Sequence, residues 1–324
     1  MADPKRPASG VWRAVLLRLF YGLVSLVFIS LVTFLADEIA PGDAATAVAG
    51  EKATQAQVER LRTQMGLDRP WPIRYVEFVG HAVKFDFGES YFGTKEPVNT
   101  ILGRALPMTM TLAGSAIVLA AILGISLGTV AAVWQNKPPD RIALTMSTLG
   151  VTVPNFVLAP ILVYIFAVRM DKLPTTWEVN RVAPDFFYLI LPVVVLSARP
   201  AASLTRLTRA SMVDTLSQEF IRLAVAKGVP PWQIYLKHAL RNAILPVLTS
   251  IGTSFGYLLT GSFVVETIFT MPGLGHAAID AILKGDTPLI LASTLVSGAL
   301  FVLVNLLVDM VLPMIDPRIR ESQI

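Results

Sequence analysis

Long apolar runs, separated by connections that carry nearly all of the charge, set the pattern of this chain. Five runs contain no charged residue and are long enough to cross a hydrocarbon core of about 30 Å as helices. They cover residues 19–36, 105–136, 142–168, 242–265 and 287–308. A sixth, weaker run covers residues 186–205 and contains Arg199, whose long side chain can reach the headgroups. The pattern predicts an all-α polytopic membrane protein with six transmembrane helices.

Composition agrees with a lipid environment. Of the 324 residues, 54% are hydrophobic and 15% are charged, and the mean hydropathy is +0.61. The first run follows Arg13 and Arg18 and is longer than the apolar region of a signal peptide, about 7 to 15 residues, which favours an uncleaved anchor. No cysteine is present, which excludes disulfides, thiol catalysis and thiolate metal sites.

Lysine and arginine are unevenly distributed over the connections, leaving aside the long first one. With both termini cytoplasmic, the inner segments hold Lys5, Arg6, Arg13, Arg18, Lys137, Arg141, Arg199, Arg206, Arg209, Arg222, Lys227, Lys237, Arg241, Arg318 and Arg320. The outer segments hold only Arg169, Lys172, Arg181 and Lys284. The bias predicts cytoplasmic tails at residues 1–12 and 313–324, a first transmembrane helix at 13–36, an extracytoplasmic region at 37–104 and a five-helix membrane domain at 105–312. It also accounts for a pI near 9.4 without nucleic acid as a partner.

The extracytoplasmic region contains the signature of one short amphipathic helix. Thr54 and Gln57 form a capping box, and Gly66 ends the helical pattern. The apolar positions on one face are Val58, Leu61 and Met65. We expect this helix to lie on the outer surface of the protein.

The largest inner connection, residues 206–241, contains the segment RLAVAKGVPPW. Apolar residues recur at helical spacing before Lys227 and Gly228, which supply a basic last turn and a helix stop. These residues are Phe220, Ile221, Ala224 and Val225. A double proline then presets the first turn of a second helix, which carries Trp232 and Tyr235. The segment predicts a helix, a sharp corner and another helix.

This corner has two interpretations, a partner-binding element and a hairpin on anionic lipid. Ala224 and Gly228 are small where a partner backbone can approach, and Phe220, Trp232 and Tyr235 offer the apolar surface of interface anchors. A lipid-bound amphipathic hairpin would also place Lys and Arg on its polar side. The tight corner favours the partner, because a lipid-surface helix gains nothing from such a turn.

The longer segment RLAVAKGVPPWQIYLKHALRNAILPVLT resembles the cytoplasmic coupling loop, or EAA loop, of ABC importer permeases in the dipeptide and oligopeptide group. That group has an A-x-x-x-G core followed by R/K-H-A-L-R-N-A and a proline. The corresponding residues are Ala224, Gly228, Lys237, His238, Ala239, Leu240, Arg241, Asn242, Ala243 and Pro246. Arg222 stands where the general motif has an acidic residue, which argues against a role for a carboxylate there. GLDRPWPIRY, DFGESY, EPVNTILGRALPMTMTLA, VVETIFTMPGLGHAAIDAI and VNLLVDMVLPMIDPRIR extend the resemblance over nearly the whole chain.

The resemblance implies a type I ABC importer permease in the inner membrane. Its coupling residues would be Phe220, Arg222, Ala224, Gly228, Trp232, Tyr235, His238 and Arg241. The implied partners are a second related permease, two cytoplasmic ATPase subunits or domains, an extracytoplasmic binding protein and membrane lipid. ATP and Mg would be bound by the ATPases, so no cofactor is expected in this chain. Di- or oligopeptides are the implied substrates, and importers of nickel complexes, glutathione and oligosaccharides are similar too.

The segment MPGLG at residues 271–275 interrupts the approach to the last run. Two glycines and a proline permit a re-entrant or bent segment, and an ordinary external turn fits equally well. The candidate gate residues here are Met271, Pro272, Gly273 and Gly275. Asn155 follows Pro154 inside the third run, where it either lines a pathway or satisfies the carbonyl that the proline leaves free.

Other chemistries find little support. Residues 252–256, GTSFG, match G-x-S-x-G but lie inside an apolar run with no strand before them, so close helix packing is the preferred role of both glycines. The chain has no phosphate-binding G-x-x-x-x-G-K-[ST] loop, and His81, His238 and His276 are predicted on different sides of the membrane. We expect no catalytic residue and no metal site. A secondary transporter or channel is the main alternative, disfavoured because the five uncharged runs contain no ionisable group at mid-membrane depth; an intramembrane protease is more remote.

Overall fold

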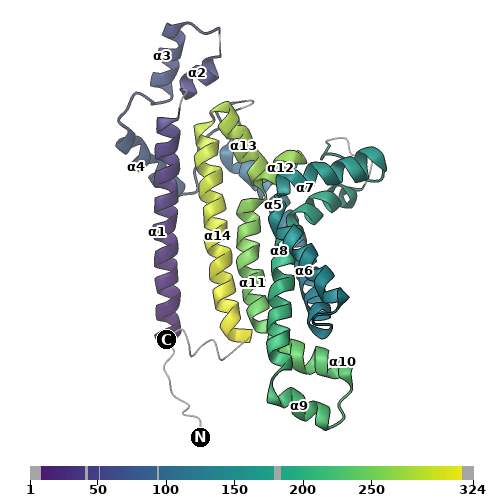
Figure 1. Ribbon diagram of the computed structural model, residues 1–324. Coiled ribbons are helices and arrows are strands. Elements are labelled where there is room, and N and C mark those ends of the chain that lie inside the picture. The colour runs from purple at the N-terminus through teal and green to yellow at the C-terminus, as the bar shows by residue number, and fades with distance from the viewer. Residues whose placement is uncertain (1–8, 41–42, 51, 93–94, 179–183, 316–324) are drawn as a thin grey trace. The chain divides into compact units, whose positions relative to one another are not determined.

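The computed structural model describes residues 9–40, 43–50, 52–92, 95–178 and 184–315, and every named element in this part of the chain is a helix (Figure 1). The all-α prediction is thereby confirmed. Two compact units are present, Met1–Thr109 with Thr270–Val302 and Met110–Phe269 with Leu303–Ile324. The helices α5 (Val98–Val133) and α14 (Thr287–Ile315) each contribute to both units.

Among the described residues, five helical stretches are long and apolar enough to cross a membrane, and a bent pair supplies a sixth if it is counted as one span. The five belong to α1 (Ser9–Ile39), α5, α8 (Asp185–Leu216), the continuous stretch Pro231–Gly261 and α14. Each coincides with an apolar run of the sequence. The bent pair falls on the third run, residues 142–168.

The third run differs from the single span that its composition suggests. The helix α6 (Pro138–Thr152) and the stretch formed by α7 (Asn155–Leu162) and the π-helical η1 (Val163–Arg169) meet at 107°. Pro154 has no amide hydrogen to continue the helix, and Val153 before it has extended backbone. The break follows directly from this proline.

The weaker run at 186–205 also differs, because α8 continues well past residue 205 to Leu216. The predicted inner loop at 206–241 therefore begins as an extension of a membrane helix. Arg199 lies within α8 and is exposed. Polar residues in this extension hid its helical continuity from a search for apolar runs.

In the first unit, α14 packs along α1. A Cβ atom added to Gly22 would meet the side chain of Val302, and Gly298 faces Leu26 and Ile29. The helix α4 (Trp71–Ala82) joins α1 through Tyr75, whose hydroxyl lies 3.0 Å from Ser30 Oγ. Small residues thus allow close approach of the two long helices.

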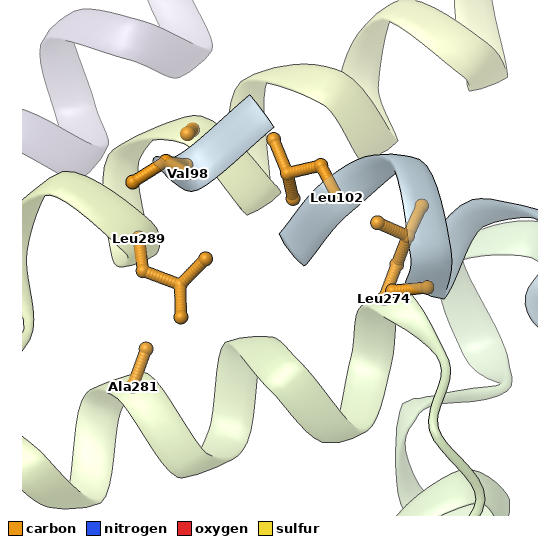
Figure 2. Packing of buried hydrophobic residues seen from close by; sticks show 7 residues of the cluster. Val98, Leu102, Leu274, Ala281 and Leu289 are labelled. Atoms are coloured by element: carbon orange, nitrogen blue, oxygen red, sulfur yellow. The ribbon is translucent and has the colours of Figure 1, made fainter. Parts of the chain in front are cut away.

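The predicted extracytoplasmic region of this unit contains α2 (Ala44–Ala49) and α3 (Gln55–Gln64) before α4. The predicted capping box is confirmed, since the Gln57 amide donates to Thr54 Oγ1 and the Thr54 amide donates to the Gln57 side chain. Gly66 follows the helix with a φ of +67°, as expected for a helix stop. Figure 2 shows a core of the same unit, where α13 (Leu274–Lys284) packs on α5 and α14. Its labelled residues are Val98, Leu102, Leu274, Ala281 and Leu289.

In the second unit, α8 packs against α5, α6 and α11 (Leu240–Gly261). A Cβ atom on Gly128 would come within 2.6 Å of the Thr205 carbonyl oxygen, and one on Gly150 within 3.0 Å of Ala202 Cβ. In α11, Gly252 faces Val308, so this glycine of the GTSFG stretch serves helix packing as predicted. The sequence continues into α12 (Phe263–Ile268).

Candidate functional site

The connection at 206–241 that is predicted to lie inside contains a compact helical hairpin. It consists of α9 (Glu219–Ala226), α10 (Pro231–Gln233) and the π-helical η2 (Ile234–Ala239), and residues 219–239 are called the helical hairpin below (Figure 1). Ser217 and Gln218 separate it from α8, and η2 continues directly into α11. The predicted order of helix, corner and helix is present.

The corner is set by Gly228, whose φ is +72°. Three amides at this point donate to carbonyls of α9: Lys227 N to Leu223 O at 3.0 Å, Gly228 N to Val225 O at 2.9 Å and Val229 N to Ala224 O at 3.2 Å. The terminal carbonyls of α9 are thus satisfied by the turn, as in a glycine-terminated helix. Within the chain, a Cβ atom at Gly228 would meet nothing within 4 Å.

One face of the helical hairpin is fixed to the rest of the second unit. Ile221, Ile234 and Ala239 are buried in a cluster with Met212 of α8 and Ala132 of α5. The same cluster includes Ala243, and partly buried residues pack against it: Val213, Leu216, Ala224, Val229, Tyr235 and Leu240. Ala224 and Tyr235 therefore contact the chain's own core, which limits the surface they can offer to a partner.

The opposite face exposes large apolar side chains. Their exposed fractions lie between 43% and 63%. They are Phe220, Leu223, Val225, Trp232 and Leu236. Sequence reasoning singled out two of them and missed Leu223, Val225 and Leu236 as anchors. The spacing was available, because Phe220 with Leu223 and Trp232 with Leu236 are three and four residues apart.

The helical hairpin also exposes charged side chains, most of them cations. Arg222, Lys227 and Lys237 are exposed, as are Glu219 and, at the start of α11, Arg241. His238 is partly buried, and its carbonyl accepts a hydrogen bond from Asn242 Nδ2 at 2.7 Å. Exposed apolar side chains together with cations are the composition of a surface that binds a protein or an anionic membrane.

The second predicted group of residues is distributed over both units. Asn155 is the first residue of α7 in the second unit, partly buried, next to the bend at Pro154. Met271, Gly273 and Gly275 lie in the first unit, where all three are buried. The exposed member of that group is Pro272.

The turn at 271–275 is anchored by backbone hydrogen bonds. The Leu274 amide donates to Thr109 Oγ1 at 2.9 Å, and the Gly273 amide donates to the Met271 carbonyl at 2.8 Å. Gly273 has extended backbone and precedes α13 directly. The segment is a tight turn ahead of a packed helix, with its glycines enclosed by protein.

An acidic group lies near the start of α14. Asp286 is buried, and it accepts hydrogen bonds from Ser90 Oγ and, at 3.1 Å, from the Tyr91 amide. Burial of the Tyr91 hydroxyl, reinforced by the nearby Asp286 charge, raises the pKa of Tyr91 to about 12. Beside it lies a hollow of about 450 Å³ between α5 and α13, lined by charged residues on both helices. Arg104 of α5 is paired with Glu96, which precedes that helix, and on α13 Asp280 is paired with Lys284 at 2.7 Å.

Comparison with known proteins supplies an independent reference. Residues 124–321 match the family "Binding-protein-dependent transport system inner membrane component", and residues 11–113 match the N-terminal family of such membrane components. The chain is 39% identical over 309 residues to a probable peptide ABC transporter permease protein, y4tP, of Sinorhizobium fredii, covering 94% of this chain and 98% of that protein. It is 40% identical over 300 residues to the glutathione transport system permease protein GsiC of Escherichia coli strain K12, covering 92% and 96%.

A solved structure, described as an amino acid ABC transporter with histidines, is similar in fold. The TM-score is 0.50 at 18% sequence identity, and the likeness covers 68% of this chain and 94% of the other. At this identity the likeness concerns the arrangement of helices alone.

Proposed function

Because the chain belongs to the family of binding-protein-dependent transport system inner membrane components, we propose that it forms the membrane pathway for import of short peptides. Membership makes it a multi-pass, non-catalytic membrane subunit of an ABC system, in which a partner ATPase binds ATP. This chain then provides the passage for the substrate, and the partner ATPase drives the transport.

The substrate class rests on the named relatives. One is described as a probable peptide permease and another as a glutathione permease, and both match more than nine-tenths of this chain. Glutathione is itself a tripeptide, so short peptides with charged termini are the chemistry common to both. Uptake of labelled dipeptides, tripeptides and glutathione, with the cognate binding protein present, tests this assignment. Uptake of a nickel complex or an oligosaccharide alone would overturn it.

We propose the helical hairpin as the docking site of the ATPase. Its exposed apolar face is the observation that carries this proposal, because the buried face already fixes it to α5, α8 and α11. A helical hairpin that exposes large apolar side chains together with cations suits a protein socket, in which buried aromatic residues dominate the affinity. The lysine and arginine distribution supports a cytoplasmic location, with both chain termini on the same side.

Truncation of the largest exposed side chain of the helical hairpin, Trp232, tests this docking site. Trp232→Ala should weaken ATPase binding by about 2 kcal/mol or more, which is roughly thirtyfold in affinity, because Trp232 is 63% exposed and free to insert into a partner. Lys227→Ala is the matched control on the same hairpin, and its loss at a solvated rim should cost about 1 kcal/mol or less. Equal effects of both substitutions on ATPase affinity would contradict the proposal.

A labelling experiment distinguishes a helical hairpin that binds the ATPase from one that lies in lipid. The chain has no cysteine, so Leu236→Cys creates a single thiol on an exposed face of η2. In proteoliposomes without ATPase this thiol should react rapidly with a water-soluble maleimide, and added ATPase should protect it. A thiol that is already protected before ATPase is added indicates that the hairpin lies in lipid.

A further inference from the structure

A partly buried ion pair links α6 to α8 in the second unit. Arg209 Nε donates to Asp140 Oδ1 at 2.5 Å, and Arg209 Nη2 donates to Asp140 Oδ2 at 2.7 Å. The side chain of Asp140 is 2% exposed and that of Arg209 is 20% exposed. The fork of the guanidinium thus engages both carboxylate oxygens, the geometry that fixes orientation as well as distance.

Asp140 also holds the turn between α5 and α6. Its Oδ2 accepts the Asn136 amide at 2.8 Å, and Asn136 has a φ of +62°, the left-handed conformation that ends α5. Through one carboxylate, Arg209 is therefore connected to the end of α5 and to the first turn of α6 at once.

Two of these helices, α5 and α8, also pack against the base of the helical hairpin. Met212 lies three residues after Arg209 on α8 and is buried against Ile221 and Ile234 of the helical hairpin. Ala132 lies four residues before Asn136 on α5 and is buried in that cluster. A displacement of the hairpin must therefore move the part of α8 that carries Arg209.

Apolar packing and the ion pair respond differently to such a displacement. Packed side chains permit small sliding movements between helices, which is how shear motions arise. A bidentate pair loses its geometry when the two helices slide or rotate, so it resists both. Buried ion pairs contribute little net stability compared with apolar residues, and their best-attested use is to specify one arrangement.

We propose that the Asp140–Arg209 pair is the tie that passes movement of the helical hairpin to α6 and the bend at Pro154, making both residues positioning residues for transport. This inference rests on the proposed function, because it requires an ATPase to move the hairpin. Without the tie, α8 would move with the hairpin while α6 stayed behind.

The decisive variant removes the tie without leaving an unpaired charge. In Asp140→Asn with Arg209→Leu, the asparagine keeps an acceptor for the Asn136 amide, and no buried charge remains. The matched control is Arg206→Gln, which removes an exposed arginine from the same helix, three residues away. Arg209→Lys keeps the charge and lacks the fork, so it tests the bidentate geometry itself.

Each variant is reconstituted with the partner ATPase and the binding protein, and labelled dipeptide uptake is measured together with ATP hydrolysis. We expect the double variant to assemble and hydrolyse ATP like the wild type, while uptake per ATP falls about 5-fold to 150-fold, the range of typical coupling energies. Uptake per ATP of Arg209→Lys should lie between that of the double variant and that of the wild type. Uptake per ATP of Arg206→Gln should match the wild type.

Wild-type uptake per ATP in the double variant would overturn the tie, and so would failure of that variant to assemble, which would show that the pair serves folding. Failure of the proposed function looks different, because the wild type itself would then show no ATP-dependent uptake.

Discussion

Substitutions at Gly228 allow the conformational cost of a side chain at the hairpin corner to be measured separately from its steric cost against a partner. Its φ of +72° lies in the left-handed region, which costs a residue with a Cβ atom about 1–2 kcal/mol. A Cβ atom would meet nothing within 4 Å of the same chain, so no steric cost adds to this within the permease. Gly228→Ala should therefore destabilise the corner by about 1–2 kcal/mol, and Gly228→Asn by less, because asparagine tolerates this conformation. Gly228→Trp should cost the same as alanine in the isolated chain.

Hydrogen exchange of the Val229 amide measures this cost, because that amide donates across the corner to the Ala224 carbonyl. In nanodiscs without ATPase, exchange should rise roughly fivefold to thirtyfold in the alanine and tryptophan variants alike. ATPase affinity should then separate them, with tryptophan far weaker than alanine because its bulk meets the socket. Equal affinity of the two variants would show that no partner covers the corner. If exchange of the Val229 amide rose as much in Gly228→Asn as in Gly228→Ala, the conformational argument would be refuted.

Two further predictions concern topology and packing. In single-cysteine variants, Ala56→Cys on α3 and Ser217→Cys before α9, both exposed, should react with an impermeant thiol reagent from opposite faces of the membrane; labelling from one side would refute the topology. Gly128→Leu should reduce the folded yield through overpacking of about 1–3 kcal/mol or more, because its Cβ atom would meet the Thr205 carbonyl. Gly114→Leu in the same helix is the control, since a Cβ atom there meets nothing within 4 Å, and equal yields would contradict the packing argument.

Local patterns allowed much of the fold to be predicted. Apolar runs identified the helices that cross the membrane, because the bilayer demands length and apolarity from each segment alone. The capping box at Thr54 and the stop at Gly228 were equally local, since each depends on a few neighbouring residues. These features need no knowledge of which segments meet.

Features that depend on distant residues could not be predicted. Asp140 and Arg209 are 69 positions apart, and nothing in either neighbourhood indicates the other. The inward orientation of Ala224 and Tyr235 likewise depends on a cluster drawn from α5, α8 and α11. The extension of α8 to Leu216 was hidden by its charged residues, which a helix beyond the apolar run tolerates.

Some predictions concern residues whose placement or side chains the structure leaves undescribed. The predicted cytoplasmic tails carry Lys5, Arg6, Arg318 and Arg320, and the predicted outer segment contains Arg181; all five lie outside the described residues. The side chain of Arg13 is likewise outside the described part. The proposed orientation therefore rests on sequence for these positions, and thiol labelling at Ala56 and Ser217 tests it directly.

Dependence of transport on a partner ATPase is the central claim. The direct measurement is accumulation of a labelled dipeptide in proteoliposomes that contain this chain, the second permease, the binding protein and the ATPase. The ATPase is supplied either intact or with the lysine of its phosphate-binding loop replaced. The account predicts accumulation with the intact ATPase and ATP, and none with the inactive one. Accumulation that persists with the inactive ATPase, or that follows an ion gradient, would contradict it.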